Sequence, residues 1–170
     1  MSHEIVSGVL KGKKILLLYA KFFNYDLIVK NKLIEMGAEV DLFDARAELN
    51  VYEKTIIKIY TGEFWLKLKK YHKEIQEKKK GADYDIIFTN SYLPIEAIQG
   101  YKETFPKAKL ILYLDDSVAN TRGVEKTFSY YDKVMTFDKR DSLRYGIGFR
   151  PLYFEDSYKQ TIKEPFSYDL

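Results

Sequence analysis

The chain has 170 residues, of which 46% are hydrophobic and 16% aromatic, enough to bury the core of one domain. Its 28 lysines and arginines against 25 acidic residues give a net charge of +3, which predicts neither nucleic-acid nor membrane binding. Zero cysteines exclude disulfides, a thiol nucleophile and thiolate-bound zinc, and two histidines far apart argue against a histidine metal site. We therefore expect a single domain over residues 1–170, cytoplasmic, with no signal or membrane-spanning segment, no metal, no cofactor and no nucleic-acid partner.

The first half of the chain alternates between continuous apolar runs, typical of strands buried on both faces, and segments with helical spacing. Strands are expected at residues 14–19, 39–44 and 84–89. Apolar residues recur at helical intervals over 24–36, where Gly37 follows as a C-cap, and over 52–80, where Gly62 marks a place for a break.

The second half continues the alternation. Helices are expected at residues 94–104, 124–131 and 139–145, the last ended by Gly146. Strands are expected at 109–114 and 133–137, with a last candidate at 149–153 whose Pro151 favours the edge of a sheet. The pattern predicts an α/β fold: a three-layer, doubly wound parallel sheet of about five strands, Rossmann-like or flavodoxin-like.

Ligands of such sheets bind beyond the carboxyl ends of the strands, so the candidate loops are 20–24, 90–94, 115–122 and 138–141. The first of them has no glycine and no P-loop pattern, which argues against a dinucleotide or phosphate site. It also lacks the acidic pair with which a response-regulator receiver holds magnesium, and has Lys21 instead. Phe22, Phe23 and Tyr25 are either an aromatic platform for a sugar or other flat apolar face, or a cover of the core.

Asp115, Asp116 and Ser117 follow a buried strand at its ligand-facing end. A carboxylate there is suited to general-base chemistry, because apolar walls raise its pKa toward neutrality. The alternative is that Asp116 or Ser117 caps the next turn. Arg122 is either a partner for a carboxylate or an anionic ligand, or an exposed ion pair of little consequence.

Asn90, Ser91 and Tyr92 occupy the equivalent place one strand over, where they either bind hydroxyl groups or form a turn before the Pro94 helix. Asp138 and Asp141 are expected to cap a short helix. The expected substrate-binding residues are therefore Phe22, Asn24, Tyr25, Asn90, Ser91, Tyr92, Ser117 and Arg122.

One dense basic run lies in the 52–80 helix: lysines 67, 69, 70, 73, 78, 79 and 80. A solvated helix surface is the favoured interpretation, because Glu74 and Glu77 interrupt the run. Together with Trp65 these lysines also allow a peripheral contact with anionic lipids, at the inner face of the membrane.

Taken in order, several segments resemble the N-terminal half of a bacterial glycosyltransferase family with lipopolysaccharide, capsule and spore-maturation functions. They are residues 14–19, 84–87, 112–117, 131–138, 145–146 and 150–153, and the resemblance runs from Lys13 to Leu170. It implies that the chain is the acceptor-side domain of a two-domain GT-B enzyme, inactive alone, with residues 168–170 opening an absent donor-binding domain.

The resemblance further implies a nucleotide-sugar donor held through that missing domain, a sugar or lipid-linked acceptor, and no obligatory metal. A carboxylate would deprotonate the acceptor, with Asp116 as the expected catalytic base and Asp115 as the second choice. Two alternatives remain open. One is a standalone flavodoxin-like module that binds a sugar or a partner protein, and the other is a domain that pairs with a separate donor-binding subunit. An exposed apolar patch near Leu152, Tyr153 and Phe154 would favour either association.

Overall fold

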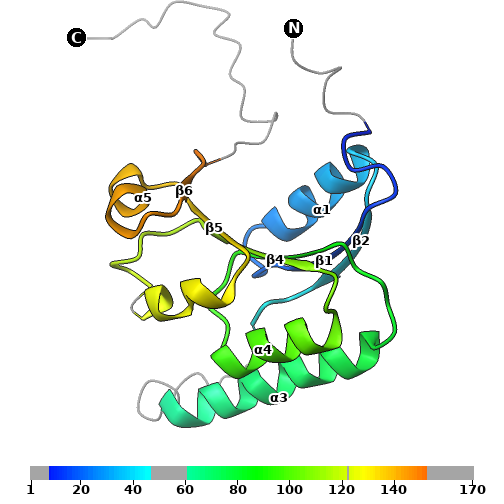
Figure 1. The fold of residues 1–170 in the computed structure, drawn as a ribbon, viewed down its shortest axis with the longest axis horizontal. Helices are drawn as coiled ribbons and strands as arrows, with labels where there is room; N and C mark the ends of the chain where they lie inside the picture. Colours follow the sequence, from blue (N-terminus) through cyan, green and yellow to red (C-terminus); the bar gives the residue numbers. More distant parts are fainter. Residues whose placement is uncertain (1–7, 47–60, 122, 153–170) are drawn as a thin grey trace, which may run out of the picture.

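The fold is built on one parallel sheet, seen in a computed structural model that describes residues 8–46, 61–121 and 123–152 (Figure 1). Its six strands lie in the order β2-β1-β3-β4-β5-β6, and every neighbouring pair is parallel. Their bounds are β1 (Lys14–Leu18), β2 (Glu39–Phe43), β3 (Ile86–Thr89), β4 (Lys109–Leu114), β5 (Lys133–Thr136) and β6 (Gly148–Phe149).

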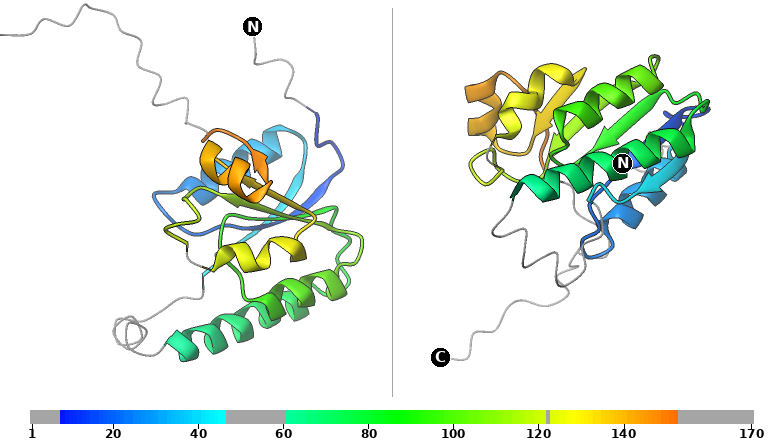
Figure 2. Two further views of the ribbon diagram at one scale, coloured as in Figure 1. Left: turned by 60° about the vertical axis from the view of Figure 1, so that its left-hand side comes forward. Right: turned by 90° about the horizontal axis from the view of Figure 1, so that it is seen from below.

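Helices cover both faces of this sheet. They are α1 (Tyr25–Glu35), α3 (Thr61–Lys79), α4 (Ile95–Thr104), the 3₁₀ helix η1 (Val124–Tyr130) and α5 (Lys139–Tyr145). Helix α1 lies on one face, and α3, α4 and η1 lie on the other, with α3 and α4 packed side by side (Figures 1 and 2). The predicted α/β fold, a three-layer doubly wound parallel sheet of the flavodoxin-like kind, is confirmed.

Most element bounds agree with the predictions to within a residue or two, and the differences have local causes. Residues 124–130 form a 3₁₀ helix, which begins after Gly123 at φ 88° and ends at the extended Tyr131. The last strand consists of Gly148–Phe149 and stops two residues before Pro151, because proline has no N–H to donate to a ladder. The part of the predicted 52–80 helix before Thr61 lies outside the described residues.

Two Tyr-Asp pairs begin strands, and each aspartate binds the neighbouring strand. The Asp85 carboxylate accepts from the Lys14 N–H at 2.9 Å and pairs with the Lys13 ammonium at 2.7 Å. The Asp132 carboxylate accepts from the Leu110 N–H at 2.8 Å. Each carboxylate thus accepts from a backbone N–H near the start of the neighbouring strand, at the first residue of β1 and at the second residue of β4. The two aspartates therefore have a structural role within the sheet.

The main core lies between the sheet and the α3–α4 side. Leu16 and Leu18 are fully buried in it, and they pack with Ile75 of α3 and with Ile98 and Tyr101 of α4. The two helices approach closely at Gly100, where an added Cβ would lie 2.5 Å from the Gln76 side chain. Gln76 uses that side chain to donate to the Ala97 carbonyl at 3.0 Å, which ties α3 to α4.

His72 is fully buried in this core and makes two hydrogen bonds. Its Nε2 lies 3.1 Å from the Ala45 carbonyl, and its Nδ1 lies 2.9 Å from the Tyr101 hydroxyl. Because a carbonyl only accepts, Nε2 carries the proton, and the neutral ring accepts from Tyr101 at Nδ1. Burial lowers the pKa of His72 from 6.5 to about 4, so the ring is neutral in the folded protein at neutral pH.

The buried tyrosines give a matched test of such hydrogen bonds. The Tyr131 hydroxyl is buried and makes no hydrogen bond of good geometry in the described part of the chain, although the Leu93 backbone lies close enough to favour its ionised form, whereas the Tyr101 hydroxyl donates to His72. We expect Tyr101→Phe to lower the free energy of unfolding by about 1–2 kcal/mol, because it leaves the His72 Nδ1 unsatisfied. Tyr131→Phe should change it by less than about 0.5 kcal/mol or raise it. Urea denaturation of both variants decides the point, and equal losses would contradict these assignments.

Candidate functional site

A chain of hydrogen bonds joins the carboxyl ends of three neighbouring strands. The Asn90 side-chain oxygen, after β3, accepts from the Ala20 N–H after β1 at 3.0 Å and from the Ser91 hydroxyl at 3.1 Å. The Asn90 amide nitrogen donates to the Asp115 carboxylate, after β4, at 2.8 Å. The structure thus brings together three of the predicted site residues, Asn90, Ser91 and Asp115, and uses their polar groups to hold the loops to one another.

The two adjacent aspartates have different environments. Asp115 is exposed to solvent at its outer side, yet desolvation by the surrounding protein is the main cause that raises its pKa above the ordinary value, with a smaller contribution from Asp116. Asp116 accepts from the Ser117 N–H at 2.8 Å and from the Asn120 amide at 2.9 Å. This is the capping role given above as the alternative to catalysis. A catalytic role for either residue stays a prediction.

The next two aspartates are also bound within the protein. Asp138 is the N-cap of α5, where its carboxylate accepts from the Arg140 N–H at 2.7 Å. Asp141 accepts from the Val118 N–H at 2.8 Å. It therefore holds the loop after β4 in place and does not act only as a negative charge at the start of α5. Ser117 lies half-buried in that loop, and Arg122 lies outside the described residues.

The loop after β1 carries the other predicted substrate-binding residues. Phe22 and Phe23 are exposed, whereas Tyr25 is half-buried at the start of α1. Asn24 is the N-cap of α1 in a left-handed conformation, and its side chain makes no capping bond. Tyr92 is half-buried and packs its ring edge-on against Trp65 at 5.0 Å. Tyr92 therefore belongs to the packing of α3 and not to the loop that holds Phe22.

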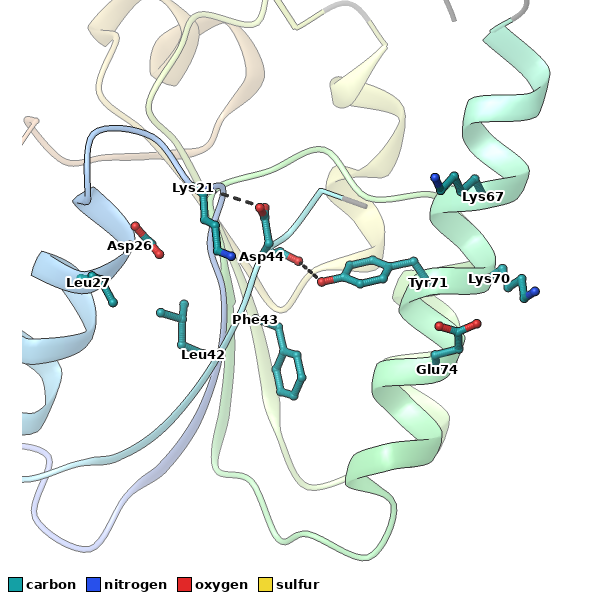
Figure 3. A pocket seen from close by; sticks show the side chains of 10 residues that line it. All are labelled: Lys21, Asp26, Leu27, Leu42, Phe43, Asp44, Lys67, Lys70, Tyr71 and Glu74. Carbon is teal, nitrogen blue, oxygen red and sulfur yellow. Dashed lines mark hydrogen bonds between the residues drawn. The ribbon is translucent and has the colours of Figure 1, made fainter. Parts of the chain in front are cut away.

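A groove of about 620 Å³ lies at the edge strand β2 (Figure 3). It runs from α1 on one face of the sheet, across the end of β2, to α3 on the other face. Its lining residues are Lys21, Asp26, Leu27, Leu42, Phe43, Asp44, Lys67, Lys70, Tyr71 and Glu74. The volume lies within the range of small-molecule sites. Of the residues in the predicted candidate loops, only Lys21 lines the groove.

Hydrogen bonds hold the floor of this groove in place. The Tyr71 hydroxyl donates to the Asp44 carbonyl at 2.9 Å, one residue before the carbonyl that His72 binds. The Asp44 carboxylate accepts from the Arg46 N–H at 2.9 Å, and the Arg46 guanidinium donates to the Lys21 carbonyl. Helix α3 and the loop after β1 are thereby fixed to the end of β2.

Three ammonium groups (Lys21, Lys67 and Lys70) and three carboxylates (Asp26, Asp44 and Glu74) line the groove. The Asp44 carboxylate accepts from backbone N–H groups and pairs with Arg46, and Asp26 lies in the first turn of α1, where the helix dipole favours an anion. In Figure 3 the ammonium groups of Lys21 and Lys67 point toward the groove, whereas that of Lys70 points away. Two ammonium groups thus lie above a floor formed by Leu42 and Phe43.

Sequence reasoning missed this groove because it depends on which strand lies at the edge. The signal that was available is the spacing of Lys67, Lys70, Tyr71 and Glu74, which puts these residues on one face of α3. That face was interpreted above as a solvated surface.

Comparison with known proteins gives little more than the fold. No protein-family model and no curated protein matches the chain. Among solved structures, the chain is similar to a crystal structure of histidine kinase ThkA in complex with response regulator protein TrrA, with 17% identity, a TM-score of 0.44, and coverage of 78% of this chain and 93% of that one. A structure of TrrA from Thermotoga maritima in complex with Mg(2+)-BeF matches at 19% identity, a TM-score of 0.41 and the same coverages.

These findings correct the expected function. The structures that match are response-regulator proteins and not glycosyltransferases, and neither other comparison returns a glycosyltransferase. The resemblance to a GT-B half, with its lipopolysaccharide or capsule role and its sugar and lipid-linked partners, is therefore wrong. The alternative of a module for a sugar or a partner protein gains no support either. The reason is physical: the segments that carried the resemblance are strand runs and strand starts, and Asp85 and Asp132 in them bind the backbone of neighbouring strands.

Among the residues that the structure describes, no helix has the length and apolar character needed to cross a membrane. No group of three or more histidine, cysteine or acidic side chains in the same part of the chain is placed to hold a metal ion. The extent of the domain over residues 1–170 stays a prediction.

Proposed function

We propose that this protein is a binding domain for a small organic anion with a flat apolar portion, held in the groove at the β2 edge. The observation that carries the proposal is the groove itself, in which the Lys21 and Lys67 ammonium groups face a floor of Leu42 and Phe43 (Figure 3). Ligand pockets combine apolar surface with polar groups that fix orientation. Here Leu27, Leu42, Phe43 and Tyr71 supply the apolar surface, and charged side chains supply the rest of the lining.

The anionic part of the ligand is expected to lie between α3 and the loop after β1. Lys21 on the loop approaches it from one side, and Lys67, which also interacts within the protein, faces it from α3, while Asp44 is occupied by its bonds to Arg46. Exposed ammonium groups contribute about 1 kcal/mol or less each to such a contact. The apolar part is expected to pack on Phe43 and Leu42, where burial contributes about 25 cal/mol per Å² of apolar surface.

The rigidity of the floor supports binding without large rearrangement. Tyr71 and His72 of α3 hold the consecutive carbonyls of Asp44 and Ala45, so the end of β2 cannot move independently of α3. A preformed site avoids the entropic cost of ordering side chains on binding. The lack of cysteine fits a reducing compartment, and the proposal places the protein in the cytoplasm.

Two probes of nearly the same size and shape, one charged and one neutral, test the proposal: 2-naphthoate and its amide. We expect 2-naphthoate to bind with a dissociation constant on the order of 1 mM, from roughly 0.3 kcal/mol per non-hydrogen atom. Lys21→Gln and Lys67→Gln should each weaken naphthoate binding about threefold to fivefold and leave amide binding unchanged. Isothermal calorimetry or NMR titration measures the dissociation constant of each probe for the wild type and the variants.

Lys133→Gln is the control, because Lys133 is exposed, as Lys21 is, but begins β5, which three strands separate from β2 in the sheet. It should bind both probes as the wild type does. Equal weakening by all three lysine variants would show a general charge effect and would overturn the proposed site.

A further inference from the structure

One carboxylate of the groove lies directly beside its apolar floor. Asp44 follows Phe43 at the end of β2 and lines the groove, and its side chain is only 14% exposed. A carboxylate in this place repels a bound anion, and water screens that repulsion less than it would at a fully exposed site. The groove therefore favours an anion only if a group of the protein offsets the charge of Asp44.

Arg46, two residues further along the chain, makes the contacts that offset it. Its backbone N–H donates to the Asp44 carboxylate at 2.9 Å, and its guanidinium Nε lies 3.9 Å from the same carboxylate oxygen. The guanidinium also donates through Nη2 to the Lys21 carbonyl. One side chain thus contacts both the carboxylate beside the floor and the backbone of the residue whose ammonium points toward the groove (Figure 3).

These contacts let Arg46 act on the groove from outside, since it is not among the residues that line it. Its positive charge offsets the negative charge of Asp44, and its bond to the Lys21 carbonyl fixes the backbone that carries the Lys21 ammonium. A longer hydrogen bond of 3.5 Å from the Lys21 N–H to the Asp44 carboxylate joins these two residues directly (Figure 3). A change at Arg46 therefore alters the charge of the groove without removing any atom of its lining.

We propose that Arg46 is the positioning residue that makes the groove select an anion over a neutral molecule of the same shape. This inference rests on the proposed function and deepens it, because it assigns the preference for negative charge to a residue outside the lining. Without the guanidinium, the Asp44 carboxylate would repel the ligand, and the Lys21 backbone would lose an anchor. Both changes weaken the binding of a charged ligand and leave its apolar contacts in place.

The test uses Arg46→Gln in the full chain with the same two probes, 2-naphthoate and 2-naphthamide. We expect the variant to bind naphthoate about threefold to tenfold more weakly than the wild type and to bind naphthamide as the wild type does. Arg46→Lys keeps a positive charge and should weaken naphthoate binding less than Arg46→Gln. Isothermal calorimetry measures the dissociation constants, and thermal melting checks that each variant folds.

A double variant separates the offset of charge from a merely structural role. Asparagine at position 44 can still accept from the backbone N–H of residue 46, but it carries no charge. Arg46→Gln combined with Asp44→Asn should therefore bind naphthoate more tightly than Arg46→Gln alone, by about threefold. If the double variant recovers nothing, Asp44 is not the charge that Arg46 offsets, and the inference is overturned.

Arg140→Gln is a closely matched control. The Arg140 N–H donates to the Asp138 carboxylate at 2.7 Å, and its guanidinium lies 3.6 Å from that carboxylate, so the pair repeats the contacts of Asp44 and Arg46 at the same spacing in the sequence. This pair begins α5, which packs on β5 and β6 at the opposite edge of the sheet from β2. Arg140→Gln should bind both probes like the wild type.

The possible outcomes distinguish this inference from the proposed function. If Arg46→Gln binds naphthoate like the wild type while Lys21→Gln loses it, the role of Arg46 is overturned and the groove stands. If Arg46→Gln loses both probes equally, Arg46 only supports the fold of the loop, and the inference is overturned. Equal weakening by Arg140→Gln would show a general charge effect and overturn it as well. If the wild type binds neither probe, the proposed function fails and the inference fails with it.

Discussion

The free energy of unfolding is expected to fall by about 3 kcal/mol as the pH drops from 6.5 to 4, on account of a single buried histidine. His72 has an ordinary pKa of 6.5 in the unfolded chain and a pKa of about 4 in the folded protein, where burial disfavours the charged ring. Between these values the unfolded state binds more protons. The stabilisation that comes from neutral, buried His72 is therefore fully present above about pH 6.5. It is lost as the pH falls toward and through the pKa of His72 in the folded protein.

The hydrogen bonds of His72 explain why protonation of its ring is unfavourable in the folded protein. A proton on Nδ1 would meet the Tyr101 hydroxyl, which now donates to that nitrogen at 2.9 Å, and the charged ring would remain buried beside the Ala45 carbonyl. No carboxylate is among the groups that affect the pKa of His72. The charge would therefore stay unpaired in the core.

Urea denaturation at intervals between pH 7 and pH 4 measures this effect, and His72→Gln isolates it. A glutamine amide can still donate to the Ala45 carbonyl, but it does not titrate. We expect the variant to be less stable than the wild type at pH 7 and nearly independent of pH in this window. A variant with the slope of the wild type would assign the pH dependence to other groups and contradict the prediction.

Leu16→Ala is expected to lower the free energy of unfolding by about 3 kcal/mol. Leu16 is fully buried in the middle of β1, a strand with neighbours on both sides, and it packs in the core with Ile75 and Ile98. Removal of its side chain leaves a cavity that these helices cannot close, because α3 and α4 are fixed to each other at Gly100 and Gln76.

The same substitution at an exposed site provides the control. Leu143 on α5 is 85% exposed, so Leu143→Ala should change stability by less than about 0.5 kcal/mol. Guanidinium denaturation of both variants compares them directly. Similar losses for the two leucines would mean that the core does not lie where the sheet and α3–α4 place it.

The fold was predictable because its elements depend on local patterns. Leu16, Leu17 and Leu18 form a continuous apolar run, and all three are fully buried in β1, as the run predicts for a central strand. Gly146 ends α5 in a left-handed conformation, the role its position in the sequence indicates. Short connections between such elements leave few arrangements besides a parallel sheet.

The candidate site was predictable only in part, because polar residues at strand ends have two uses. Asn90 and Asp115 lie where a ligand would bind, but they bind each other, and Asp116 caps a turn. The position of such a residue in the sequence does not show whether it binds a ligand or another part of the protein, because that depends on which groups the fold places within hydrogen-bond distance. The groove depends on the strand order, which brings Lys21 of one loop and Tyr71 of a distant helix to the same edge.

The resemblance to glycosyltransferases failed for a related reason. Its segments are strand starts and strand ends, and features such as Tyr84-Asp85 and Tyr131-Asp132 are fixed by hydrogen bonds to neighbouring strands. Such features are shared by α/β proteins with different functions.

The most direct test of the groove is an amide NMR titration of the full chain with 2-naphthoate. We predict that the largest shift changes occur at Leu27, Phe43, Asp44 and Tyr71, which surround the groove, and that the amides of Val134 and Met135 in β5 stay unchanged. Shift changes centred on Ser91 and Ser117 at the carboxyl ends of β3 and β4, or no saturable change up to several millimolar probe, would contradict the account.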